Sequence, residues 1–323
     1  MSAQEARERL KDLTKIYWHH TLRLFPDLIV EGAKTAELLE AEREAILGVV
    51  DLAHRSVIDV GAWNGYFAFE AKRAGAARVI ATDSFVWRSP DFRGREAFDI
   101  ARECLDLDIE AKDIDPTEFP GDMEPVDVVL FLGVLYHLID PIMVLQKVAA
   151  LANDLLVIET HQDVLTMPQP AMTFYPGATL NNDATNWWGP NPECMTELLA
   201  TVDFRHVFYQ WHPRIPRRGI YHAFRSTDTA RRYLRRPPDN VTFFDLGTEV
   251  GQRAIFGAKS LDAEAAANEL AKVVAERDAA ANELAKIVAE RDAALAEIAA
   301  LRGSTSWSLT APLRTLSSIV RPR

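Results

Sequence analysis

The chain has 323 residues, which is longer than one ordinary core and predicts one large domain with appended structure. Hydrophobic residues make up 48% and charged residues 26%, the composition of a globular protein rather than a disordered or membrane-spanning one. The polar start, residues 1–11, lacks the apolar stretch of a secretory signal, so we expect a cytoplasmic protein. The formal net charge of −11 opposes binding to a polyanion, which disfavours nucleic acid without excluding it.

Short β-branched runs alternate with helical stretches between residues 56 and 160, which is the pattern of parallel βαβ units. The pattern predicts an α/β fold, a Rossmann-like sheet with helices on both faces. The expected strands are residues 56–60, 78–83, 109–113, 126–132 and 155–160, and the expected helices are 66–74, 94–105 and 141–151. A long loop at 167–192 interrupts this rhythm. The sheet is then completed by a helix at 192–201 and strands at 204–211 and 219–225.

The chain divides into four expected parts. Residues 1–50 form a helical cap, 51–258 the main α/β domain, 259–302 a coiled-coil helix and 303–323 a basic amphipathic tail. Within the third part a stretch of 14 residues, ANELAKVVAERDAA, occurs twice with one conservative change. Its apolar stripe predicts a homo-oligomer or a partner helix, and packing back onto the main domain is the alternative.

The sequence predicts neither a bound metal nor a disulfide framework. Its two cysteines, Cys104 and Cys194, are too few and too far apart for either. Several histidines show no metal-ligand spacing, namely His19, His20, His206, His212 and His222. Arginines cluster at residues 214–218 and 231–236, where a focused anion site and ordinary solvated loop charges are both open interpretations.

A glycine-bearing turn follows the first predicted strand of the main domain. Residues 57–65 read VIDVGAWNG, in which Gly61 and Gly65 can adopt dihedrals closed to other residues and let the backbone approach a ligand. The next strand ends at Asp83, the spacing at which an acidic side chain meets ribose hydroxyls in such folds. A third strand ends at Asp113, and the combination favours an adenosine-type cofactor.

This region resembles the class I S-adenosylmethionine methyltransferases, whose first motif has the form acidic-x-Gly-x-Gly-x-Gly. Here the acidic residue is Asp59 and the first and last glycines are Gly61 and Gly65. Ala62 follows the first glycine, and Trp63 replaces the middle one. The resemblance implies that the turn approaches the methionine part of the cofactor and that Asp83 holds the ribose. It also implies that Asp113 and Ile114 flank the adenine.

A second resemblance begins at Phe131, where residues 131–141 read FLGVLYHLIDP. This segment is similar to one in the tRNA wobble-uridine modifying methyltransferases, a group that includes enzymes using carboxy-S-adenosylmethionine. The resemblance implies that Tyr136 contacts the reactive end of the cofactor, that Leu132 lines the pocket and that His137 lies at its mouth. The Lys- and Trp-rich segment of the carboxymethylating members is not recognisable upstream, so we expect ordinary S-adenosylmethionine.

Methyl transfer to a hydroxyl needs a group that removes its proton, and histidine suits this because its ordinary pKa lies near neutrality. We expect His137 to be this base, with His161 and Glu159 at the end of the fifth strand as alternatives. The long loop carries Trp187 and Trp188, whose flat rings could bind a sugar or a base, and Asn191, which could orient hydroxyls.

The tail, GSTSWSLTAPLRTLSSIVRPR, has no acidic residue and mixes apolar residues with arginine. It resembles a tail that recurs on bacterial glycosyltransferases and associated glycan-modifying enzymes. It therefore favours peripheral contact with the inner membrane or with a partner protein, and O-methylation of a sugar in a surface glycan or its precursor. A tRNA wobble-uridine modifying enzyme and a non-catalytic coiled-coil scaffold are the alternative hypotheses.

Overall fold

The computed structural model describes residues 1–12, 16–235, 244–246 and 291. The chain divides into two units, Met1–Ser260 and Leu261–Arg323, and the fold given below belongs to the first. Apart from residue 291, the predicted coiled coil (259–302) and tail (303–323) lie outside the described residues, so self-association and membrane contact stay predictions. In the described part of the chain, no helix is long and apolar enough to cross a bilayer.

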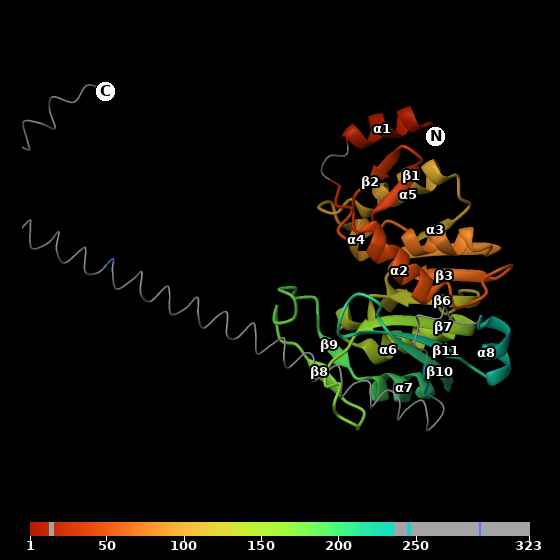
Figure 1. Ribbon diagram of the computed structural model, residues 1–323, viewed down its shortest axis with the longest axis vertical. Helices are drawn as coiled ribbons and strands as arrows, with labels where there is room; N and C mark the ends of the chain where they lie inside the picture. The colour runs from red at the N-terminus through yellow and green to blue at the C-terminus, as the bar shows by residue number, and fades with distance from the viewer. Residues whose placement is uncertain (13–15, 236–243, 247–290, 292–323) are drawn as a thin grey trace, which may run out of the picture. The chain divides into compact units, whose positions relative to one another are not determined.

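One mixed sheet forms the centre of the first unit, with strand order β12-β10-β11-β7-β6-β3-β4-β5 (Figure 1). The strands from β7 to β5 in this order are parallel, whereas β11, β10 and β12 extend the sheet antiparallel beyond β7. The bounds are β3 (Ser56–Val60), β4 (Arg78–Asp83), β5 (Glu110–Asp113), β6 (Val126–Leu132), β7 (Ala152–His161), β10 (His206–Trp211), β11 (Arg218–Phe224) and β12 (Phe244–Asp245). The predicted Rossmann-like sheet is confirmed.

Helices cover both faces of this sheet, because its strands alternate buried side chains between two apolar clusters. One cluster joins the sheet to α2 (Ala36–Ile46), α3 (Tyr66–Arg73), α5 (Gly94–Leu105) and α8 (Thr227–Tyr233). The other joins it to α6 (Pro141–Ala150) and α7 (Pro192–Thr201). Three short helices complete the connections: α4 (Phe85–Arg88), η1 (Pro116–Glu118) and η2 (Leu135–His137).

The predicted bounds hold for β3, β4, β6, α5 and α7, and differ by one to three residues elsewhere. β7 begins at Ala152 rather than at residue 155 and runs on to His161. β10 begins at His206, because Asp203 takes a left-handed φ of 64° and Phe204 turns into the core before the strand starts. Short β-branched runs therefore predicted where the strands lie, while local turns set their ends.

The sequence predicted a helical cap at residues 1–50, but this part also contains two strands. After α1 (Ala3–Asp12) comes a hairpin of β1 (Leu22–Phe25) and β2 (Leu28–Val30), and then α2. The Oγ1 atom of Thr35 accepts the backbone N–H of Leu38 at 3.3 Å and begins α2. Leu22 and Leu24 are buried in the same cluster as α3 and α5, so this part packs on the central sheet rather than standing apart.

Candidate functional site

The turn between β3 and α3 is left-handed at three positions. Gly61 has a φ of 82°, Trp63 of 52° and Gly65 of 88°. A Cβ atom on Gly61 would lie 2.5 Å from the Cγ2 atom of Val134, and one on Gly65 would lie 2.6 Å from the ring of Phe69. Both glycines are therefore required by backbone conformation and by space. The turn is tied to β4, because Gly61 and Ala62 donate their N–H groups to the carbonyl of Thr82 at 2.8 and 3.0 Å.

Asp83 lies at the end of β4 beside this turn. Its carboxylate accepts the N–H groups of Trp63 at 3.0 Å and Val86 at 3.3 Å. Burial raises the pKa of Asp83 to about 6. Asp113, at the end of β5, is in register with Asp83 and pairs with Arg88 at 2.7 Å. The structure thus brings together the two acidic residues that the sequence assigned to ribose and adenine.

Three buried polar atoms near the turn have no hydrogen-bond partner among the residues that the structure describes. They are Oδ2 of Asp59, Nδ2 of Asn64 and Nδ1 of His20. Burial raises the pKa of Asp59 to about 7, a sign that its negative charge is poorly compensated. A ligand that brings a cationic group and hydrogen-bond acceptors to the turn would satisfy these atoms, which fits the methionine end of S-adenosylmethionine.

Trp63 is packed by the segment that precedes the first hairpin. Its ring stacks on His19 with centroids 4.7 Å apart at 20°, and it also contacts Tyr17 and Phe92. The backbone N–H groups of His19 and His20 donate to Oδ1 of Asn64 at 2.7 and 3.3 Å. Residues 16–20 therefore line the glycine turn, a contribution that sequence reasoning missed.

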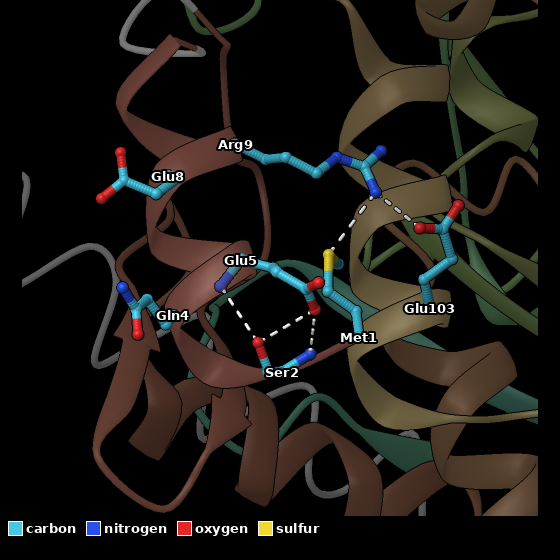
Figure 2. Close-up of a pocket in the computed structure, with 7 residues that line it drawn as sticks. All are labelled: Met1, Ser2, Gln4, Glu5, Glu8, Arg9 and Glu103. Carbon is cyan, nitrogen blue, oxygen red and sulfur yellow. Dashed lines mark hydrogen bonds and ion pairs between the residues drawn. The ribbon is translucent and has the colours of Figure 1, made fainter.

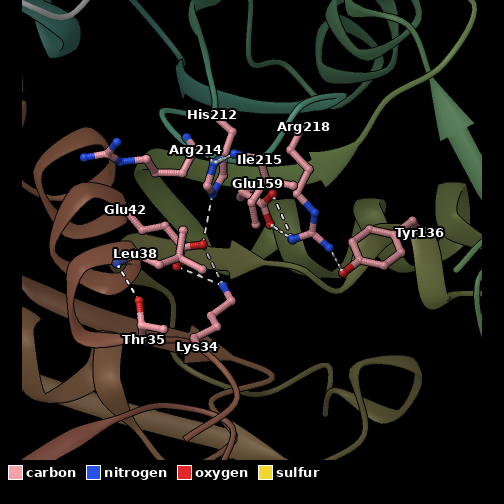
Figure 3. A network of polar contacts seen from close by, with 10 residues as sticks. All are labelled: Lys34, Thr35, Leu38, Glu42, Tyr136, Glu159, His212, Arg214, Ile215 and Arg218. Atoms are coloured by element: carbon pink, nitrogen blue, oxygen red, sulfur yellow. Dashed lines mark hydrogen bonds and ion pairs between the residues drawn. The ribbon is translucent and has the colours of Figure 1, made fainter. Parts of the chain in front are cut away.

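A second group of side chains gathers at the carboxyl ends of β6 and β7 (Figure 3). The guanidinium of Arg218 donates to both carboxylate oxygens of Glu159, at 3.0 and 2.9 Å, and to the hydroxyl of Tyr136. Arg218 also lies over the ring of Tyr136, 4.8 Å from its centroid. Burial lowers the pKa of Arg218, but Glu159 and Tyr136 raise it more, so the cation is kept. The sequence marked Arg218 only as a member of the arginine cluster at 214–218 and did not predict that it pairs with Glu159 and Tyr136.

His137 follows Tyr136 in η2, and its side chain is held in one tautomer. Its Nδ1 lies 3.2 Å from the carbonyl oxygen of Thr185 and 2.9 Å from the Thr185 hydroxyl. A carbonyl only accepts, and that hydroxyl already donates to Asp183 at 2.7 Å, so Nδ1 must carry the hydrogen. The lone pair of Nε2 is then free to accept a proton. Burial lowers the pKa of His137 from its ordinary value.

His161 ends β7 and is linked to the long loop. Its Nε2 lies 3.1 Å from the Tyr175 hydroxyl, which donates to Asp163 at 2.5 Å. Burial, with a smaller effect of Arg218, lowers the pKa of His161 to about 4. Asp163 also pairs with Arg217 at 3.2 Å. His161 is thus a neutral group within a tether that fixes the loop to the sheet.

The long loop lies against η2 and forms a small sheet of β8 (Met172–Phe174) and β9 (Trp188–Pro190). Trp187 donates its backbone N–H to the carbonyl of Tyr136 at 2.8 Å, and the indole of Trp188 donates to the carbonyl of Ile139 at 3.3 Å. Phe174 contacts both tryptophan rings and is half exposed. The loop therefore brings an aromatic surface to the Tyr136 side of the site.

Asn191 does not share that surface. It is fully buried and forms the N-cap of α7, where Oδ1 accepts the N–H groups of Ala171 and Cys194 at 3.1 and 2.8 Å. Its Nδ2 donates to the carbonyls of Met167 and Gln169 at 3.1 and 2.8 Å. The amide has no group left for a substrate, so the expectation of a substrate contact is corrected to a structural role.

Two further residues that the sequence assigned to the cofactor pocket are Leu132, at the end of β6, and Ile114, just after β5. Leu132 packs partly buried against one apolar cluster and Ile114 against the other. A pocket of about 870 Å³ lies elsewhere, between α1 and the end of α5 (Figure 2). It is lined by Met1, Ser2, Gln4, Glu5, Glu8, Arg9 and Glu103. It contains no residue of the glycine turn or of η2, so it does not define the site.

Two curated relatives are tRNA U34 carboxymethyltransferases. The protein from Methylococcus capsulatus is 29% identical over 163 residues, which cover 49% of this chain and 47% of the relative. The protein from a Geobacter species is 28% identical over 167 residues, which cover 48% and 46%. The chain therefore spans about half the length of the curated relatives that it matches.

Solved structures show a weaker likeness. The N-terminal domain of EvdMO1, solved in the presence of SAH and D-fucose, is 17% identical with a TM-score of 0.48 and covers 70% of this chain and 97% of its own. Magnesium protoporphyrin IX methyltransferase from Synechocystis, with bound SAH, is 19% identical with a TM-score of 0.43 and covers 59% and 83%.

The family model described as a methyltransferase domain matches residues 17–230. This range holds the glycine turn, Asp83, η2, Arg218 and the aromatic loop, and it begins with the segment that packs on Trp63. The prediction of a methyltransferase is therefore confirmed. Because this match covers more than half of the chain, the chain belongs to the methyltransferase domain family.

Proposed function

We propose that the chain transfers a methyl group from S-adenosylmethionine to a sugar hydroxyl of a bacterial surface glycan or its precursor. The observation that carries the proposal is the pair of contacts from Nδ1 of His137 to Thr185, which leaves Nε2 of this ring, packed against Tyr136, as the nitrogen that can accept a proton. A hydroxyl is a poor nucleophile until its proton is removed, and a positioned imidazole supplies that function.

The glycine turn holds S-adenosylmethionine, which supplies an electrophilic methyl group when bound. Gly61 and Gly65 allow the close approach, and Asp83 is placed to accept from the ribose hydroxyls. Asp59 and Asn64 carry the unpartnered atoms that would meet the methionine end. These residues bind and orient the donor, and orientation is the main requirement of a direct group transfer.

The donor is ordinary S-adenosylmethionine rather than its carboxylated form. A carboxylate on the transferred group would need an uncompensated cation close to the reacting atoms. The two cations in the polar network of Figure 3 that face inward, Arg218 and Lys34, are already bonded to Glu159 and Glu42. His19 is neutral, because burial lowers its pKa to about 4. This charge balance supports transfer of an uncharged methyl group.

His137 is the base among the three candidates. Both oxygens of Glu159 are bonded to Arg218, so this carboxylate is occupied in holding the cation. His161, with a pKa of about 4, is too weak a base for a hydroxyl near neutral pH. His137 keeps an accessible nitrogen, and Thr185 and Asp183 orient its ring.

A sugar is the acceptor that the surroundings of His137 favour. Phe174, Trp187 and Trp188 offer apolar ring faces, on which pyranose C–H groups can stack. The net charge of −11 opposes a polyanionic acceptor. The second candidate, modification of a tRNA wobble uridine, is favoured by the names of the curated relatives and by the exposed Arg217 beside the loop. A scaffold without activity is disfavoured by the assembled cofactor residues.

A transfer assay with radiolabelled S-adenosylmethionine tests the acceptor. Matched amounts of surface glycan, its lipid-linked precursor and total tRNA from the same cells are incubated with the purified full chain. Label should enter the glycan or precursor fraction and not the tRNA. Label confined to tRNA would overturn the sugar proposal and leave the methyltransferase assignment intact.

Replacing His137 with alanine tests the base. We expect kcat to fall about 10²- to 10⁴-fold, because the acceptor loses its proton acceptor, while cofactor affinity is retained. In the unchanged protein the rate should fall as pH drops through the pKa of His137, and this limb should vanish in the variant. His206→Ala is the control, since His206 pairs with Phe224 at the far end of β11 from Arg218. Normal turnover by His137→Ala across the pH range would remove His137 from catalysis.

The Asp59→Asn variant tests whether the buried carboxylate of Asp59 destabilises the folded protein when no ligand is bound. A folded-state pKa of about 7, above the ordinary 3.8, means that the folded protein binds more protons between those values than the unfolded chain does. This group therefore lowers stability as pH rises through that window. We therefore expect the unfolding free energy of Asp59→Asn minus that of the unchanged protein, measured in urea, to be about 1 to 3 kcal/mol larger at pH 8 than at pH 5.

The same Asp59→Asn variant should bind S-adenosylmethionine more weakly, since the charge that meets the methionine end is lost. Asp108→Asn, at an exposed position, is the matched control and should change neither property. A pH-independent stability difference for Asp59→Asn would show that Asp59 is charged and compensated in the folded protein.

A further inference from the structure

The connection between β10 and β11, residues 212–217, is folded around the side chain of His212. The Nδ1 atom accepts the backbone N–H groups of Arg214 at 3.1 Å and Ile215 at 2.9 Å. Because Nδ1 accepts, the ring hydrogen sits on Nε2, which donates to Oε1 of Glu42 at 2.9 Å. The side chain of His212 is completely buried, so both ring nitrogens are fully used inside the protein.

Glu42 belongs to α2, in the N-terminal part, and is almost completely buried. Lys34 donates to both of its carboxylate oxygens, at 2.8 and 2.9 Å. Burial raises the pKa of Glu42, but the bonds from His212 and Lys34 lower it more, so the carboxylate stays charged. One buried anion therefore joins α2 and the nearby Lys34 to the distant His212 loop, as Figure 3 shows.

The far end of the same connection is Arg218. His212 donates its backbone N–H to the carbonyl of Arg218 at 2.9 Å, and Gln162 donates its backbone N–H to the carbonyl of Arg217 at 2.7 Å. The Arg218 guanidinium then reaches Glu159 and the hydroxyl of Tyr136. A continuous set of bonds thus leads from α2 through His212 to the side chain that holds Tyr136.

We propose that Glu42 and His212 are positioning residues that set the place of Arg218 and, through it, of η2 with Tyr136 and His137. The proposal rests on the proposed function for the identity of η2 as part of the active site. Loops hold reacting groups less well than strands do, and a displacement of about 1 Å can cost about 10²-fold in rate. Pro213 and Pro216 restrict the backbone of this loop, and the buried Glu42–His212 bond fixes the loop to α2.

The variants separate the two bonds of His212. His212→Ala removes both, whereas His212→Asn keeps an oxygen near the place of Nδ1 for the loop N–H groups but cannot reach Glu42. Glu42→Gln keeps the shape of the carboxylate and removes its charge. The control is Gln210→Leu: Gln210 on β10 donates to the carbonyl of Ala45 at 2.5 Å, so it links the same helix and strand but does not bond to the loop.

Hydrogen exchange of the full chain gives a readout that needs no acceptor. In His212→Ala, and less in His212→Asn, exchange should quicken at residues 212–218 and also at 134–138, about tenfold or more. Glu42→Gln should show the same change at both segments. Gln210→Leu should leave 134–138 unchanged. Faster exchange at 212–218 alone, in all three variants, would overturn the proposal.

Kinetics per folded molecule provide the second readout. The His212 and Glu42 variants should lose about 10- to 100-fold in kcat, with cofactor affinity changed less than about twofold, because the bonds that these variants remove are not made to the glycine turn itself. His212→Asn should recover part of the loss. Equal losses of kcat in His212→Ala and Gln210→Leu would mean a general effect of destabilisation and would also overturn the proposal. If the unchanged protein methylates no acceptor, the proposed function fails, and the exchange at 134–138 still decides the positioning role.

Discussion

The left-handed turn between β3 and α3 is the constraint on which the rest of the site depends. Gly61 and Gly65 lie at φ values that favour glycine, and Val134 and Phe69 leave no room for a side chain at either position. Because the turn bonds to β4 and approaches Val134 after β6, it links the end of β4 to η2. Trp63, in a left-handed conformation without being glycine, is held there by His19, Tyr17 and Phe92.

Charge is balanced locally at the edge of the sheet where the site lies. Arg218 is paired with Glu159, and Lys34 with Glu42, so both of these partly buried cations are compensated. The exceptions are Asp59 and Asp83, whose raised pKa values mark carboxylates with too few compensating partners. A buried charge without compensation is costly, and a cationic or hydroxyl-rich ligand is a reason to keep it.

Much of the fold could be predicted, because its parallel strands are short apolar runs separated by helices of ordinary length. Gly61, Gly65 and Asp83 were found for the same reason: their spacing follows from a strand, a turn and the next strand. Asn191 precedes Pro192 at the start of α7, a pattern typical of an N-cap, so the sequence also indicates the structural role that the side chain has.

The residues that were missed come from distant parts of the chain. Arg218 meets Tyr136 and Glu159 only because β11 inserts antiparallel beside β7, and the order of strands in a sheet is not written in local periodicity. His19 reaches Trp63 because an unpredicted hairpin at residues 22–30 folds the N-terminal part back over the glycine turn. The link from Glu42 to His212 spans two parts that the sequence presents as separate segments.

Calorimetric titration of S-adenosylmethionine into the full chain and into Asp83→Ala tests most directly whether the glycine turn is the cofactor site. The unchanged protein should bind one equivalent, and the variant should bind about 10- to 150-fold more weakly, because a hydrogen bond to a charged group contributes about 1.5 to 3 kcal/mol. Equal affinity of the two proteins for S-adenosylmethionine would contradict the placement of the cofactor at this turn.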